Sequence, residues 1–177
     1  MTRIDLHMIL QTVGPGGYGD LVTRRTGQAV RNGIEPMLAD HPPGDLALVD
    51  FSTVRLIDYS CADEIVGQLL LRHGHAQYFL LVGVRDHHLE AIEPVLERHG
   101  LAVVAQDHTG RIRLLGRLPE DVMRVYAVLV ETGGAEPAAI AEALGLGLDT
   151  AKAIMADLLR RRLVRPDGPA FRPLMCA

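Results

Sequence analysis

The chain contains 177 residues, which is enough for one large hydrophobic core or two small ones. Hydrophobic residues make up 48% and charged residues 23%, as in an average globular protein, so the composition excludes general disorder, a collagen-like repeat and a heptad rod. The net charge of −4 argues against a protein that coats nucleic acid or membranes with its whole surface, and it leaves a local basic face open.

The first part of the chain begins with an apolar segment that stops at a run of glycines. Ile4–Val13 is predicted to be a strand, and the glycine-rich run 14–19 a loop after it. From Asp20 onward the apolar residues recur at helical spacing, and Pro36 is expected to kink or end this helix. The segment His41–Asp45 is then typical of a turn.

After this turn, strand-like and helix-like segments alternate. Short runs that are almost entirely apolar predict buried strands, and segments with one apolar stripe predict helices. The predicted elements are a strand at Leu46–Phe51, a helix at Ser60–Arg72, a strand at Tyr78–Val84, a helix at Asp86–His99, and a closing pair of strands at Leu101–Ala105 and Arg111–Leu115. This alternation predicts an α/β domain with a sheet of about five strands and helices packed on it.

The periodicity changes near residue 117, where strands give way to helices. We therefore expect two domains, residues 1–116 and 117–177, joined by a linker that is too short and too poor in glycine and serine to be a floppy tether. The second domain is predicted to contain helices at Glu120–Val130, Pro137–Leu144 and Thr150–Leu163, followed by a hairpin that turns at Pro166-Asp167-Gly168.

Single residues mark the ends of these helices. Pro137 suits a first helical turn, Gly145 a C-terminal cap and Asp149 an N-cap. Two helices, a tight turn, a third helix and a hairpin are the layout of a winged helix-turn-helix, and Ala139–Ile154 and Leu158–Val164 resemble that family closely. The resemblance covers nearly all of the second domain and implies DNA binding.

The resemblance also implies which residues would contact DNA. Thr150 and Lys152 are the candidates on the third helix, whose first half would face the groove. No arginine, asparagine or glutamine stands there for a bidentate contact with a base. The candidate phosphate ligands lie at the end of that helix and on the hairpin, and are Arg160, Arg161, Arg162, Arg165 and Arg172.

The charge of the second domain weighs against DNA binding. Residues 118–177 carry seven basic and eight acidic side chains, whereas duplex binding usually leaves a basic footprint. Arginines at a helix end also complement the helix dipole without any ligand. The alternative is therefore a winged helix used as a protein-docking or dimerising module. Homodimers are common in this family, but nothing in the sequence fixes an interface.

Polar residues also gather around the start of the helix predicted at Ser60–Arg72. Asp50 ends the preceding buried strand, and Asp58 and Tyr59 lead into Ser60. Ser60 is predicted to be the helix N-cap, with Asp63 as a capping-box-like partner three residues later. A serine at an exposed helix N-terminus is also a good phosphorylation site, because the phosphate would meet backbone N–H groups or change a docking face.

This stretch resembles the STAS domain family, whose best-known members are anti-sigma factor antagonists. In that family a strand ending in Asp leads to an Asp-Ser-Ser-Gly turn, and a partner kinase phosphorylates the second serine. Ser60 matches that serine, while Tyr59 replaces the first serine and Cys61 replaces the glycine. Asp50-Phe51 and Ala62-Asp63-Glu64 are closer to a prokaryotic STAS-like branch, which often lacks the phosphorylatable serine. The residues implied in phosphorylation or partner docking are Asp50, Asp58, Tyr59, Ser60 and Asp63.

Other site classes are disfavoured. The run 14–19 lacks the ending of a phosphate-binding loop, and His73-Gly74-His75 and His87-His88 lack the spacing of metal ligands. No nucleophile elbow surrounds Ser60. We therefore expect no metal, no cofactor and no enzymatic activity.

The sequence also suggests a compartment. No apolar run approaches the ~18 residues of a membrane span, and Asp5 interrupts what would be a signal peptide. Cys61 and Cys176 are too few for a disulfide framework and fit a reducing compartment. We expect a cytoplasmic, bacterial-type regulator, in which a STAS-like domain receives a protein or ligand signal and a winged helix binds a DNA operator. The alternative is a pure interaction protein that takes part in partner switching with a kinase or an anti-sigma-like protein, without DNA.

Overall fold

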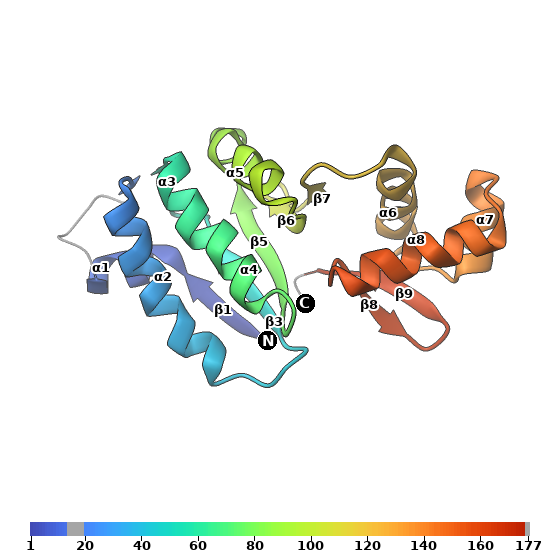
Figure 1. Cartoon of the computed structure of the whole chain (residues 1–177), viewed down its shortest axis with the longest axis horizontal. Coiled ribbons are helices and arrows are strands. Elements are labelled where there is room, and N and C mark those ends of the chain that lie inside the picture. The colour runs from blue at the N-terminus through green and yellow to red at the C-terminus, as the bar shows by residue number, and fades with distance from the viewer. Residues whose placement is uncertain (14–19, 176–177) are drawn as a thin grey trace. The chain divides into compact units, whose positions relative to one another are not determined.

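The computed structural model describes residues 1–13 and 20–175, so the predicted loop 14–19 and Cys176 lie outside the described residues. The chain divides into two compact units, Met1–Arg117 and Leu118–Ala177 (Figure 1). None of the helices in the described ranges is both long enough and apolar enough to cross a membrane.

A five-stranded sheet forms the centre of the first unit. Its spatial order is β1 (Thr2–Asp5), β3 (Leu46–Asp50), β5 (Tyr78–Val84), β6 (Val103–Asp107) and β7 (Ile112–Leu115). Neighbouring strands are parallel except β7, which is antiparallel to β6. Two short strands, β2 (Asp20–Leu21) and β4 (Leu56–Ile57), form a separate parallel pair. The predicted α/β unit with a sheet of about five strands is confirmed.

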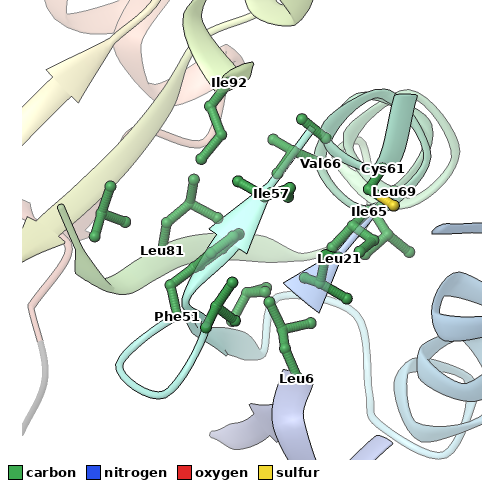
Figure 2. Packing of buried hydrophobic residues seen from close by; sticks show 14 of the residues in the cluster. Leu6, Leu21, Phe51, Ile57, Cys61, Ile65, Val66, Leu69, Leu81 and Ile92 are labelled. Carbon is green, nitrogen blue, oxygen red and sulfur yellow. The ribbon is translucent and has the colours of Figure 1, made fainter. Parts of the chain in front are cut away.

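The helices of the first unit share one core with one face of this sheet (Figure 1). They are α1 (Leu6–Val13), α2 (Arg24–Ala39), α3 (Tyr59–Ala62), the π-helical turn η1 (Asp63–Gly67), α4 (Gln68–His73) and α5 (Asp86–His99). Phe51 and Leu81 from the sheet side belong to the same buried cluster as Ile65 and Ile92 from the helices (Figure 2). The parallel strands advance across the sheet in one direction, and right-handed crossovers then bring every connection to the same face.

The strand predicted at Ile4–Val13 is wrong after Asp5. β1 ends at Asp5, whose carboxylate accepts hydrogen bonds from the backbone N–H groups two and three residues later, at 3.0 and 3.1 Å. Such a cap starts a helix, and in α1 both Leu6 and Leu10 are buried in the core. The apolar run fits the periodicity of a strand as well as that of a helix, so the cap and the packing decide that Leu6–Val13 is helical.

Other predicted boundaries shift by a few residues. Pro36 does not end α2, which continues to Ala39 although the proline supplies no N–H for an intrahelical hydrogen bond. The helix predicted at Ser60–Arg72 is present as α3, η1 and α4 in succession, and the strand predicted at Leu101–Ala105 lies two residues later, as β6.

The second unit contains three helices and a hairpin, as predicted. They are α6 (Glu120–Thr132), α7 (Pro137–Leu144), α8 (Leu148–Arg160), β8 (Val164–Asp167) and β9 (Ala170–Pro173). In the segment between α6 and α7, Ala135 forms an isolated antiparallel β-bridge with Phe171 of β9. Each of the three helices contributes fully buried side chains to this unit, among them Leu129, Ile140 and Met155.

Two of the three predicted helix ends in this unit are confirmed. Pro137 lies in the first turn of α7, and Gly145 caps α7 in the left-handed conformation, with φ 65°. Asp149 is not the N-cap of α8, since the helix begins at Leu148 and Gly147 is its cap. The tight turn between α7 and α8 is therefore only three residues long, and Asp149 lies in the first turn of α8, where a negative charge suits the helix dipole.

A buried histidine ties together two loops at the end of the sheet. His88 has no exposed surface; its Nδ1 accepts a hydrogen bond from the backbone N–H of Arg85, so Nε2 carries the proton and donates to the carbonyl of Val54 at 2.9 Å. Burial lowers the pKa of His88 to about 4, although the bond to Val54 opposes this shift. The loop that leads from β3 toward Asp58 is therefore held by a neutral side chain.

The pKa of His88 predicts that the protein loses stability in mild acid. Unfolding returns the histidine to its ordinary pKa near 6.5, so below that pH the unfolded chain binds a proton that the folded chain does not. We expect the free energy of unfolding in urea to fall by about 2 kcal/mol from pH 7.5 to pH 5 through this group. His88→Gln should flatten this dependence, whereas His87→Gln, at the exposed neighbouring position, should keep it. An equal slope in both variants would contradict the assignment.

Candidate functional site

Asp58 caps the helix that begins at Tyr59. One of its carboxylate oxygens accepts the backbone N–H of Cys61 and the hydroxyl of Ser60, both at 2.8 Å, and the other accepts the backbone N–H of Thr23, also at 2.8 Å. Burial raises the pKa of Asp58, but the hydrogen bonds, led by those from Cys61 and Thr23, outweigh it and hold the pKa below the usual value. Asp58 is therefore ionised.

The predicted cap at Ser60 is wrong. Ser60 lies inside the first turn of α3, and its half-buried hydroxyl donates to Asp58 instead of accepting from a backbone N–H. The backbone of Asp58 is extended as it leaves β4, as an N-cap requires, and a carboxylate caps as well as a serine hydroxyl does. Tyr59 is half-buried, and its hydroxyl accepts a hydrogen bond from Arg98 at 3.2 Å.

Thr23 connects the start of α2 to the same carboxylate. It is the N-cap of α2 with φ 73° and ψ 141°, a backbone conformation that a β-branched residue rarely adopts. Its N–H is held by Asp58 and its carbonyl accepts the thiol of Cys61 at 3.0 Å. The backbones of α2 and α3 also approach closely here, since a methyl group at Gly27 would lie 2.9 Å from the Cα of Cys61. The starts of α2 and α3 are thus locked together.

Asp63 does not take part in a capping box. It lies in the π-helical turn η1 with Glu64, and the two side chains are only 6% and 3% exposed. Asp63 accepts hydrogen bonds from Arg24 at 2.8 Å and His99 at 2.7 Å. Burial raises the pKa of Asp63, but the hydrogen bonds from His99 and Arg24 outweigh it, so its pKa is lowered.

Glu64 is the most enclosed acidic group of this cluster. It accepts hydrogen bonds from Arg24 at 2.7 Å and from Arg31. Arg31 itself is largely enclosed, with a side chain that is 12% exposed. A buried carboxylate without cationic partners is strongly unfavourable, so the pair fixes α2 against η1.

The sequence pattern did not point to Thr23, Arg24, Arg31 or His99 as site residues, and it included Glu64 only in the Ala62-Asp63-Glu64 motif. A local signal existed for two of them, because Arg24 and Arg31 are seven residues apart on one helix and so project from the same face. Their acidic partners lie more than thirty residues away in sequence, and only packing brings the two sets together.

Asp50 is not part of the group around Asp58. At the end of β3 it accepts hydrogen bonds from the guanidinium of Arg3, at 2.9 and 2.6 Å, and from the backbone N–H of Ser52 at 2.8 Å. Of the five residues predicted for this site, only Asp58 and Ser60 share a hydrogen bond, while Asp50, Tyr59 and Asp63 bind other partners.

The group around Asp58 offers little for covalent catalysis. Burial and the neighbouring Asp58 raise the pKa of the Cys61 thiol to about 12, so it stays protonated. The hydroxyl of Ser60 faces a carboxylate whose pKa is lowered, which makes it a poor base. Within residues 1–13 and 20–175, no cluster of three or more His, Cys, Asp or Glu side chains is arranged to hold a metal ion. The arrangement is suited to holding two helices together.

The residues predicted to contact DNA lie on α8 and the hairpin. Thr150 and Lys152 are exposed in the first half of α8. Arg165 and Arg172 are directly opposite each other on β8 and β9, so their side chains share one face of the hairpin. The run Arg160–Arg162 joins α8 to that hairpin, and Arg162 has the left-handed φ of 56° that reverses the chain.

Charge is divided within this unit in a way that its total hides. From Leu148 to the end of β9 there are six basic and three acidic side chains, whereas residues 118–147 carry one basic and five acidic side chains. The region of α8 and the hairpin is therefore positive, and that of α6 and α7 is negative.

No family model matches the chain, and no curated protein matches it at a significant level.

The cap assignment predicts different costs for two neighbouring substitutions. Asp58→Ala leaves the N–H groups of Cys61 and Thr23 without their acceptor, and should lower the free energy of unfolding by about 2 kcal/mol. Ser60→Ala removes one hydroxyl and leaves the cap in place, so it should cost less than about 1 kcal/mol. Urea unfolding of both variants measures the difference. A larger cost for Ser60→Ala would restore Ser60 as the cap.

The buried ion pair predicts a large effect for a nearly isosteric change. Glu64→Gln keeps the shape but removes the buried anion shared by Arg24 and Arg31, which leaves the enclosed Arg31 with only the more exposed Glu35, and it should destabilise the protein by about 3 kcal/mol. Glu35→Gln is the control, because Glu35 also pairs with Arg31 but is more exposed, and it should cost less than about 1 kcal/mol. Equal unfolding free energies for the two variants would contradict the importance of Glu64.

Proposed function

We propose that the chain is a transcription regulator whose second unit is a winged helix that binds duplex DNA. The supporting topology is a helix, an isolated β-bridge at Ala135, two helices separated by a three-residue turn, and a two-stranded hairpin that takes part in that bridge. In a winged helix the third helix enters the major groove and the hairpin lies beside it. α8 would be the recognition helix and the β8–β9 hairpin the wing.

The observation that carries this proposal is the division of charge. The third helix and the wing, which a winged helix turns toward DNA, lie in the basic segment, whereas residues 118–147 are acidic. A duplex attracts the first region through its phosphates and repels the second, which orients the unit as well as binding it. Lys152 and Thr150 would face the groove, and the arginines of the wing would hold phosphates.

We propose that the first unit is a STAS-like receiver whose input acts at Ser60. The hydroxyl of Ser60 donates to an ionised carboxylate, so a phosphate or a docked acidic group there would meet the charge of Asp58. Asp58 also holds Thr23 in a strained conformation at the start of α2. A modification or a partner at Ser60 would thus loosen the α2–α3 junction, and a cytoplasmic kinase or an anti-sigma-like protein is the expected partner.

A specific observation favours the alternative, a protein-docking module without DNA. Asp157 pairs with Arg160 and Arg161, and Asp167 pairs with Arg172, so at least three of the six basic side chains in the α8–hairpin region are already ion-paired within the chain. A partner-switching protein would need no basic surface at all.

Binding to DNA at several salt concentrations distinguishes the two functions. The full chain is titrated with duplex from its own upstream region and with a scrambled duplex of the same composition. We expect binding that weakens steeply with salt, and Lys152→Ala should weaken it several-fold and reduce the salt slope by about one charge. Arg124→Ala on α6 is the matched control and should change little. If neither duplex is retained at low salt, the second unit is a protein-docking module.

A further inference from the structure

Asp157 stands among the arginines at the end of α8 and holds two of them. One carboxylate oxygen accepts a hydrogen bond from the guanidinium of Arg160, and the other accepts one from the Nε–H of Arg161 at 2.8 Å. The Asp157 side chain is 23% exposed, whereas that of Arg160 is 76% exposed. Each arginine gives this carboxylate a charge-assisted hydrogen bond, which is the kind of bond that it would give to a phosphate oxygen.

The hairpin contains a second pair of the same kind. Asp167 forms an ion pair with Arg172, in which a carboxylate oxygen lies 2.6 Å from Nε, and the two side chains are 49% and 63% exposed. Arg172 lies opposite Arg165, where two like charges would otherwise repel each other across the strands. Two carboxylates on separate elements therefore act on three of the arginines expected to contact phosphate.

We propose that Asp157 and Asp167 are internal counter-ions that weaken the attraction of this surface for DNA of any sequence, and so leave selection to the contacts of α8 with bases. The proposal rests on the DNA-binding function proposed above. Sequence-independent affinity comes from phosphates neutralised by basic side chains. An arginine already neutralised by a fixed carboxylate contributes less, because its pair must open and the carboxylate then remains beside the phosphate.

These ion pairs are suited to weaken the binding of phosphate without preventing it. They lie at the surface, where an ion pair gains little and can exchange its partner for another anion. A phosphate held in place by base contacts would therefore replace the carboxylate, whereas a phosphate of a random sequence would compete poorly with it. The near-neutral total charge of the second unit then favours selectivity.

The test removes each carboxylate without changing its shape. Asp157→Asn and Asp167→Asn are titrated with the upstream duplex and the scrambled duplex over a salt series. We expect each variant to bind the scrambled duplex about five- to tenfold more tightly near 0.1 M salt, and the salt slope to steepen by about 0.9 for each carboxylate removed. The preference for the upstream duplex should fall. Thermal unfolding shows that each variant is folded.

The control removes the same negative charge from a residue outside the two pairs. Glu142→Gln changes an exposed residue on α7, in the acidic region, and should leave both affinities nearly unchanged. If it tightens binding as much as Asp157→Asn does, net charge rather than pairing is responsible and the proposal is overturned. If the wild type binds DNA but neither aspartate variant binds more tightly, the proposal fails while DNA binding stands. If no protein binds either duplex, the proposed function fails with it.

Discussion

Two carboxylates buried in the middle of one helix constrain much of the first unit. Asp63 and Glu64 lie in a π-helical turn and require cationic partners, since an unpaired charge in this environment is strongly unfavourable. α2 supplies the cations Arg24 and Arg31, and His99 of α5 forms a hydrogen bond with Asp63. Arg24 directly follows the cap of α2, so its ion pairs lie at the start of that helix. π-helical turns often occur at functional sites, and here the turn lies next to the capped end of the helix.

The junction at Asp58 is an extension of this constraint. Once α2 is held against η1, the backbone at Thr23 adopts a conformation that costs energy, and Asp58 binds its N–H. The same carboxylate caps α3 and accepts the hydroxyl of Ser60. A single ionised group therefore joins the residue that resembles a phosphorylation site to the start of another helix. This coupling gives the proposed signal a physical route within the unit.

In the second unit, the distribution of charge matters more than its sum. A net charge near zero arises from a basic region at α8 and the hairpin and an acidic region at α6 and α7. The carboxylates of Asp157 and Asp167 reduce the basic region further by pairing with its arginines. The proposed function follows from this arrangement, in which attraction to phosphate is present but moderated. A uniformly basic domain would bind DNA tightly and with little selectivity.

The sequence by itself determined the alternation of strands and helices, the five-stranded sheet, and the three helices and hairpin of the second unit, because periodicity, prolines and glycines act locally. It wrongly predicted a strand over the whole of Ile4–Val13, because the apolar run fits two periodicities, and it wrongly assigned the helix cap to Ser60, because several neighbouring residues satisfy the same local rule. Tertiary structure decided that Asp58, which also binds the backbone of Thr23, is the cap of α3, and that Glu64 meets Arg31. These outcomes depend on which polar groups distant in sequence are buried together, and burial makes hydrogen bonding and charge pairing obligatory.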